Sequence, residues 1–384
     1  MIKLGVFYNG IEICRDDKII HARFLVPHRV ISTCSVAGGL QQSLEYIYNH
    51  QSCEPSGHHC PAADVMKKSP EDYRAIVCER NGLPADRCAT LGTAANMRYA
   101  SLQHQMFRDL EVIAVCTGGV ETNGGRAGDP ASNYESDGIF EKLPSTPVAP
   151  VNGTINTMLF ISKELTDGAL VRTIMTATEA KTAALQELAV PSRYSDGLAT
   201  GTGTDQIGVA CRTGGTIPLT SAGKHSKLGE LIGVAVHDAI KETLRLQNGL
   251  EPSHQRSVCT LTRRFGNDKE TMISNICSHL SETDADLFRK NFMCIDRDPL
   301  VAGALCGFAD VHDKIRYGIL PSSCFRELYG MYAAQMASAV SGRPDLFAKY
   351  RNTLVDAATA PDNASLLECI YRSIAVGFTD KWAG

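Results

Sequence analysis

The sequence predicts a mixed α/β fold, with a layered α+β domain over 1–250 and an all-α C-terminal region over 251–384. Two patterns predict this division. In the first part, short β-branched runs alternate with helical periodicity, and glycine is concentrated there. In the second part, apolar residues recur at steps of three and four without strand signals. A chain of 384 residues is long enough to bury two cores.

In the N-terminal part, the predicted strands alternate with helices. We expect strands over 111–116, 154–161 and 207–210, where β-branched and apolar residues are concentrated. We expect helices over 168–188 and 228–246, where apolar residues repeat with the helical period. The segments 53–62 and 129–150 are rich in Pro, Gly and small polar residues, which predicts loops.

In the C-terminal part, helices are expected over 271–280, 285–292, 325–341 and 346–358, separated by Pro, Gly and Asn-Asp signals. The join falls at 248–252, where Gly249 is typical of a helix C-terminus and Pro252 follows. This region carries no recognisable motif. An oligomer interface, a lid over a bulky substrate and an elaboration of the core all stay open as its role.

Charge and hydropathy restrict the class of partner. Lys and Arg number 38 and Asp and Glu 42, which gives a formal net charge of −4. A nearly neutral chain does not favour nucleic acid or an anionic membrane as its partner. No apolar stretch approaches the roughly 20 residues of a membrane helix, and the first five residues do not resemble a leader. We therefore expect a cytoplasmic protein with a small-molecule partner, whose 14 cysteines are reduced thiols.

An apolar strand runs into a glycine-rich polar loop that contains Gly118, Gly119, Asn123 and Asp129. Glycines let backbone amides approach a ligand closely and form an anion-binding nest. A tight structural turn is the alternative. Asn156 lies in the middle of the next predicted strand among apolar neighbours, so its amide either joins a polar network or contacts a ligand.

Lys181 lies near the centre of the apolar face of the predicted helix over 168–188, whereas Glu179 lies on its polar side. A lysine that points towards a core is costly unless it is paired or lines a cavity, so Lys181 is a candidate site residue. The alternative is a lysine whose ammonium reaches solvent along the helix.

Two further segments have residue types suited to catalysis. Thr202 and Thr204 alternate with glycines and lead to Asp205 at the start of a strand, where a carboxylate can orient a nucleophile or act as a general base. A structural Asx turn is the alternative. His225 lies just before the helix predicted over 228–246, where an imidazole can serve as acid or base.

One cluster has the composition of a metal site, namely Cys53, His58, His59 and Cys60. Its spacing fits no standard zinc pattern, and the sequence nearby contains no second cysteine pair that could complete the site. We therefore predict no metal site.

Taken in order, blocks of the chain over about residues 25–246 resemble the adenosylcobinamide amidohydrolase family, whose members remodel corrinoids in cobalamin salvage. The blocks are Ser32-Thr33-Cys34 with Gly38-Gly39 and Asn49, Gly92-Thr93-Ala94-Ala95, Thr117-Gly118-Gly119 with Ala127-Gly128-Asp129, Gly153-Thr154-Ile155-Asn156, Thr178-Glu179-Ala180-Lys181, Ala199-Thr200-Gly201-Thr202-Gly203-Thr204-Asp205 and Lys224-His225-Ser226-Lys227-Leu228-Gly229-Glu230.

The resemblance implies an enzyme that hydrolyses the amide between a corrin propionate and the aminopropanol arm of adenosylcobinamide, giving adenosylcobyric acid. It implies no cofactor beyond the cobalt of the corrinoid substrate. A homo-oligomer is compatible with it. After the glycine turn this chain has Glu121-Thr122-Asn123-Gly124-Gly125 in place of the family's usual Ser-Asn-Ala, so a different corrinoid or amide stays open.

On this basis we predict the catalytic residues to be Thr117, Asn123, Lys181, Asp205 and His225. We predict the substrate-binding residues to be Gly118, Gly119, Asp129, Asn156, Glu179, Thr202 and Thr204. The glycine turn with Asn123 or Asn156 would stabilise the oxyanion, Asp205 and Lys181 would activate a threonine hydroxyl or a water, and His225 would protonate the departing amine.

Two alternatives to this function stay open. One is a non-catalytic corrinoid carrier. The other is a self-processing threonine amidohydrolase that acts on a different amide, because the order of segments over 153–210 is similar to that of β-aminopeptidases and ornithine acetyltransferases. On that similarity Thr117 would be the nucleophile.

Overall fold

A computed structural model describes residues 1–52, 65, 69–144 and 153–382. The chain divides into two compact units, Met1–Glu251 and Pro252–Gly384. The loop predicted over 53–62 and the cluster of Cys53, His58, His59 and Cys60 lie outside the described residues.

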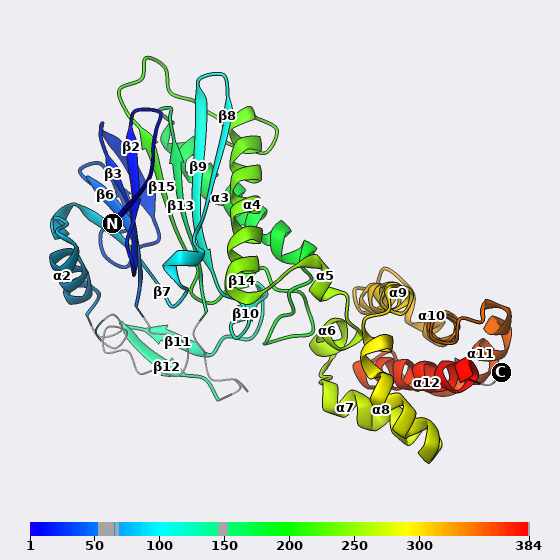
Figure 1. The fold of residues 1–384 in the computed structure, drawn as a ribbon. Helices are drawn as coiled ribbons and strands as arrows, with labels where there is room; N and C mark the ends of the chain where they lie inside the picture. Colours follow the sequence, from blue (N-terminus) through cyan, green and yellow to red (C-terminus); the bar gives the residue numbers. More distant parts are fainter. Residues whose placement is uncertain (53–64, 66–68, 145–152, 383–384) are drawn as a thin grey trace. The chain divides into compact units, whose positions relative to one another are not determined.

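Two β-sheets form the centre of the N-terminal unit (Figure 1). The first sheet has the strand order β1 (Ile2–Phe7), β2 (Ile11–Arg15), β3 (Ile19–Phe24), β6 (Tyr46–Gln51) and β7 (Cys88–Thr93). The second has the order β5 (Gly39–Gln41), β4 (His28–Ser32), β15 (Gln206–Arg212), β13 (Ile155–Ile161), β9 (Leu110–Gly118) and β8 (Ser101–Phe107). Neighbouring strands are antiparallel except for two parallel pairs, β6 with β7 and β13 with β15.

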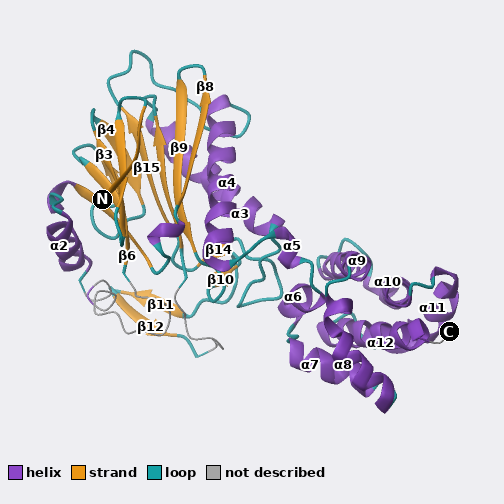
Figure 2. Ribbon diagram, in the orientation of Figure 1, coloured by secondary structure: helices purple, strands orange, loops and turns teal. Residues whose placement is uncertain are grey.

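The sheets and helices of this unit form four layers. Ile13 and Ile47 of the first sheet join Ile113 and Phe160 of the second in a buried core between the sheets. Helices α3 (Asp167–Glu187) and α4 (Lys227–Asn248) cover the outer face of the second sheet, and α2 (Pro70–Asn81) packs on the outer face of the first. Figure 2 shows this helix–sheet–sheet–helix order. The predicted mixed, layered α/β fold is confirmed.

The βαβ segment β13–α3–β15 positions the residues discussed below. All seven residues of β13 are buried, as expected for a strand covered on both faces. The Thr166 side chain accepts a hydrogen bond from the Ala169 amide and so caps the start of α3. Because β13 and β15 are parallel, they begin at the same edge of the sheet, and Asp205 therefore lies beside Ile155.

Part of the loop predicted over 129–150 is instead a hairpin of β11 (Asn133–Ser136) and β12 (Ile139–Lys142). Asp137 and Gly138 join the strands with φ of 52° and 76°, the positive values that a tight hairpin turn requires. Both strands are exposed along their whole length, so they lack the alternation of buried and exposed residues by which a strand is usually predicted. Residues 145–150 lie outside the described part of the chain.

The C-terminal unit is built from helices packed around one core that includes Phe288, Phe308, Tyr329 and Phe378. The helices are α5 (Pro252–Gln255), α6 (Val258–Thr262), α7 (Lys269–Ser278), α8 (Glu282–Asp296), α9 (Pro299–Arg316), α10 (Phe325–Ser341), α11 (Phe347–Leu354) and α12 (Asn363–Trp382). No strand occurs among the described residues of this unit, so the predicted all-α region is confirmed. None of the helices in the described ranges is long and apolar enough to cross a bilayer.

Candidate functional site

A cavity of about 750 Å³ lies in the N-terminal unit, in the size range of small-molecule sites. Its walls come from the segment after β9, from α3 and from the segment before β15. The short strands β10 (Gly124–Gly125) and β14 (Gly201–Thr202) pair with each other, which brings the two glycine-rich segments together. Of the predicted site residues, those that line the cavity are Asn123, Asp129, Lys181, Thr202 and Thr204.

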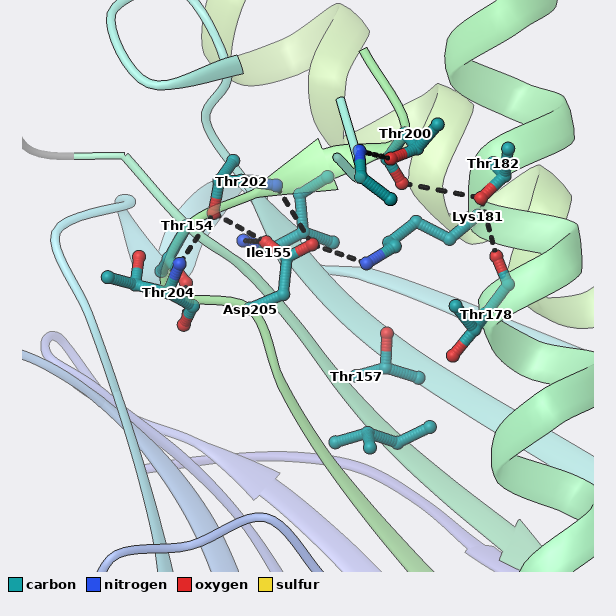
Figure 3. A network of polar contacts seen from close by, with 12 residues as sticks. Thr154, Ile155, Thr157, Thr178, Lys181, Thr182, Thr200, Thr202, Thr204 and Asp205 are labelled. Carbon is teal, nitrogen blue, oxygen red and sulfur yellow. Dashed lines mark hydrogen bonds and ion pairs between the residues drawn. The ribbon is translucent and has the colours of Figure 1, made fainter. Parts of the chain in front are cut away.

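Lys181 of α3, which lines this cavity, forms an ion pair with Asp205 (Figure 3). Lys181 Nζ contacts Asp205 Oδ2, and the two side chains are 16% and 15% exposed. Ala177 and Ala184, one turn before and after Lys181, are buried, so the lysine leaves the helix on its packed face. The ion pair offsets the cost of placing an ammonium on the packed face of α3. It therefore argues against the alternative in which the lysine extends along the helix into solvent.

The Asp205 carboxylate accepts hydrogen bonds from its own loop and from the neighbouring strand. Thr202 donates twice, from Oγ1 to Oδ1 at 2.6 Å and from its backbone amide to Oδ2 at 3.0 Å. The Ile155 amide at the start of β13 donates to Oδ1 at 2.9 Å. Asp205 therefore closes a local turn, as the structural alternative predicts, and also fixes the position of Lys181.

The close approach of Lys181 and Asp205 depends on Gly201. A Cβ atom at position 201 would lie 2.4 Å from Asp205 Oδ2 and 2.7 Å from Lys181 Nζ, closer than van der Waals contact allows. The sequence shows the glycines of this segment but does not indicate which of them is required. The alternation of Gly and Thr before Asp205 was the available signal, and it did not distinguish Gly201 from Gly203.

Asn123 and Asp129 lie on the wall formed by the segment after β9. Asn123 donates to the Gly153 carbonyl at 2.8 Å and accepts from the Tyr194 hydroxyl at 2.6 Å. Asp129 accepts from Ser192 Oγ at 2.6 Å. Burial raises the pKa of Asp129, but hydrogen bonds from Ser192, Ser195 and the Arg126 amide outweigh it and hold the pKa below its usual value. Asp129 is therefore an anion at neutral pH.

Tyr194 also lines the cavity and was missed. It belongs to no periodic segment or motif, so no sequence signal marks it.

Thr117 and Asn156 lie between the two sheets, are fully buried and do not line the cavity. Asn49 donates to Thr117 Oγ1 at 2.8 Å, and Asn156 donates to Asn49 Oδ1 and to the Gly92 carbonyl at 2.9 Å each. These contacts are the polar network that was one of the two interpretations of Asn156. These hydrogen bonds connect the first sheet to the second.

Gly118 and Gly119 also lie outside the cavity. Their amides donate to Thr243 Oγ1 at 3.2 Å and to the Thr154 carbonyl at 3.0 Å. Because both amides already have protein acceptors, the structural-turn interpretation of this segment fits better than an anion-binding nest.

Glu179 and His225 are exposed and do not line the cavity. Glu179 is paired with Lys224 at 2.8 Å, and this hydrogen bond lowers the pKa of Glu179. His225 precedes Ser226, the residue that caps the start of α4. The structure thus brings Lys181, Asp205, Thr202, Thr204, Asn123 and Asp129 to one site and leaves Glu179 and His225 outside it.

No group of three or more His, Cys, Asp or Glu side chains in the described ranges is arranged to hold a metal ion. In the cavity described above, an ion-paired lysine and carboxylate lie beside several threonine hydroxyls.

The chain belongs to the adenosylcobinamide amidohydrolase family, whose model matches residues 5–252. An uncharacterized protein of Methanocaldococcus jannaschii is 37% identical to it over 185 residues, which are 47% of this chain and 72% of that protein. The family match ends where the N-terminal unit ends, so the cavity and all the residues that line it lie within the matched part.

Proposed function

We propose that the N-terminal unit hydrolyses the amide that joins a corrin propionate to the aminopropanol arm of adenosylcobinamide, giving adenosylcobyric acid and aminopropanol. The observation that carries the proposal is the Lys181–Asp205 ion pair at the wall of a small-molecule cavity, within the residues that match the family. The cobalt ion enters as part of the substrate.

Hydrolysis of an unactivated amide needs a nucleophile, a stabiliser of the oxyanion and an acid for the departing amine. The Lys181 ammonium has three N–H donors and uses one on Asp205, so the others can stabilise an oxyanion or protonate an amine. Asn123 donates one amide hydrogen to the Gly153 carbonyl, and the second has no acceptor among the described residues. These two donors support the proposal because they come from different walls of one cavity.

The size of the cavity indicates which part of the substrate it takes. About 750 Å³ suits a drug-sized group, whereas a corrin ring with its amide side chains and adenosyl ligand is larger. We therefore propose that the aminopropanol arm and the adjacent ring edge enter the cavity and that the rest of the corrinoid stays outside.

The proposal is tested by incubating the whole protein with adenosylcobinamide and detecting adenosylcobyric acid and aminopropanol by liquid chromatography and mass spectrometry. Lys181→Met and Asp205→Asn should each lower kcat/KM by about 10²- to 10⁴-fold, the usual cost of removing an acid–base group. Lys163→Met is the matched control, because Lys163 forms an exposed ion pair with Asp109 away from the cavity.

Two results would contradict the proposal. A shift of the visible corrinoid bands without product would favour the carrier alternative. Near-parental turnover in folded Lys181→Met and Asp205→Asn would show that the ion pair is not part of the catalytic site.

A further inference from the structure

Thr202 holds a hydroxyl group between the cavity and the Asp205 carboxylate. Its Oγ1 donates to Asp205 Oδ1 at 2.6 Å, and Thr202 lines the cavity. The backbone amide of Thr202 donates to the other carboxylate oxygen at 3.0 Å, and the Thr204 amide donates to Thr202 Oγ1 at 3.3 Å. The hydroxyl is therefore held in one orientation, with its proton directed at a base and a lone pair free for another atom.

The other threonine hydroxyls around the cavity have different partners. Thr204 Oγ1 donates to the Gly153 carbonyl at 2.8 Å, and Thr182 Oγ1 donates to the carbonyls of Thr178 and Thr200 at 3.0 and 3.3 Å. A neutral backbone carbonyl does not remove a proton from a hydroxyl. No acceptor for Thr178 or Thr200 occurs among the described residues, so Thr202 alone among these threonines donates to a carboxylate.

Asp205 has little capacity to activate a water instead. Its two oxygens accept from Thr202 Oγ1, from the Thr202 and Ile155 amides and from Lys181. A carboxylate has about four lone-pair sites, so all of them are used. Of these four donors, only the Thr202 hydroxyl is both a nucleophile and part of the cavity wall.

We propose that Thr202 is the nucleophile of the reaction and carries the corrinoid acyl group as an ester in a covalent intermediate. The inference rests on the proposed amidohydrolase function and replaces Thr117, which is fully buried between the sheets and out of reach of a substrate.

Thr202 Oγ1 forms a bond to the amide carbonyl carbon while its proton passes to Asp205, and the Lys181 ammonium stabilises the oxyanion. The carbon–nitrogen bond then breaks as Lys181 donates a proton to the amine, and Lys181 recovers a proton from Asp205. A water attacks the ester, its proton passes through Asp205 to Thr202 Oγ1, and the corrinoid leaves as a carboxylic acid. The sum is amide plus water giving acid plus amine.

The kinetic test compares two substitutions at the same position with adenosylcobinamide as substrate. Thr202→Val removes the hydroxyl at nearly constant volume and should lower kcat by at least 10³-fold, because the nucleophile is lost. Thr202→Ser keeps a hydroxyl and should retain turnover within about 30-fold of the parent. A hydroxyl that only holds the turn would also be lost in Thr202→Val and kept in Thr202→Ser. The melting temperatures of both variants therefore report the turn separately, and detection of the intermediate distinguishes the nucleophile from a structural role.

The second test detects the intermediate itself. The wild-type protein is quenched in acid during turnover, and the peptide containing Thr202 should carry the mass of the corrinoid acyl group. Hydroxylamine added during turnover should divert product to the corrinoid hydroxamate, since an ester is more reactive towards it than the substrate amide. Thr204→Val, which alters a neighbouring hydroxyl of the same wall, should still form the adduct on Thr202.

The outcomes separate this inference from the function on which it rests. If the wild-type protein does not cleave adenosylcobinamide, the proposed function fails and the role of Thr202 fails with it. If the wild-type protein cleaves it but Thr202→Val turns over within tenfold of the parent, or no adduct and no hydroxamate form, the reaction uses water directly and the inference alone is overturned.

Discussion

Substitution of Gly201 by alanine tests whether the Lys181–Asp205 geometry controls activity. The added Cβ would lie 2.4 Å from Asp205 Oδ2 and 2.7 Å from Lys181 Nζ, whereas ordinary contact begins at 3.4 Å. Relief of these contacts requires Oδ2 to move by about 1.0 Å and Nζ by about 0.7 Å. Both atoms end flexible side chains, but the Asp205 carboxylate is also held by two donations from Thr202, from the amide to Oδ2 and from the hydroxyl to Oδ1.

The expected magnitude follows from the size of this displacement. A misplacement of about 1 Å in catalytic geometry costs about 10²-fold in rate. We therefore expect kcat/KM for adenosylcobinamide to fall about 100-fold in Gly201→Ala, which corresponds to about 2.7 kcal/mol of transition-state stabilisation. The crowding itself should lower the free energy of unfolding by about 1–3 kcal/mol.

The assay measures initial rates of adenosylcobyric acid formation, with urea unfolding of each variant to confirm that it is folded at the assay temperature. Gly203→Ala is the matched control, because Gly203 is exposed and a Cβ there would meet no atom within 4 Å. Gly203→Ala should cost less than about threefold. Equal losses in the two variants, or a near-parental rate in Gly201→Ala, would refute the argument that this close approach positions the catalytic groups.

Four further outcomes are expected. His225→Ala should change turnover by less than about threefold, because His225 is exposed and does not line the cavity; a 100-fold loss would restore its predicted role as the acid. Asn156→Ala should lower the free energy of unfolding by about 2–4 kcal/mol, because it leaves two buried groups without partners; a change under about 0.5 kcal/mol in urea unfolding would contradict this. Burial lowers the pKa of His28 to about 4, whereas the pKa of histidine in an unfolded chain is about 6.5. As the pH falls, the unfolded state therefore binds a proton before the folded state does. The free energy of unfolding decreases from about pH 6.5 down to about pH 4 as a result. Between pH 7 and pH 5, the free energy of unfolding should therefore fall by about 2 kcal/mol less in His28→Gln than in the parent. Equal decreases in the two proteins would refute the role assigned to His28. A protein ending at Glu251 should fold and keep turnover, because the chain divides there into two compact units; an insoluble or inactive product would show that the C-terminal unit is required.

The sequence predicted those elements of the fold whose residues show clear periodicity. The β13, α3, β15 and α4 segments were predicted within a few residues, because their apolar residues repeat with the period of a strand or a helix. Helices α9 and α12 were not predicted individually, although Asp298 before Pro299 is a recognisable start signal for α9. The hairpin of β11 and β12 was missed because its exposed strands have no buried face to set a pattern.

The sequence predicted several residues of the site but not which of them meet. Lys181 and Asp205 were selected because each is an unusual residue in its setting, a lysine on an apolar face and a carboxylate at a strand start. Their contact depends on the parallel pairing of β13 with β15 and on α3 crossing between them, which one sequence does not specify. Gly118 and Gly119, in contrast, were predicted as binding residues but belong to a structural turn. Glycine composition alone does not distinguish an anion-binding nest from a turn whose amides already have protein acceptors.

The spacing of the segment from Gly201 to Asp205 has a physical reason at most of its positions. Gly201 leaves room for the ion pair, Thr202 presents a hydroxyl and an amide to the carboxylate, and Thr204 fixes the loop to the Gly153 carbonyl. Thr202 and Thr204 thus have the same side chain but different acceptors, one a carboxylate and the other a neutral carbonyl. Of these two acceptors, only the carboxylate can take a proton from a hydroxyl, so the two threonines should respond differently to substitution by valine. Thr202→Val should abolish the acyl intermediate, whereas Thr204→Val should loosen the loop and still allow the intermediate to form.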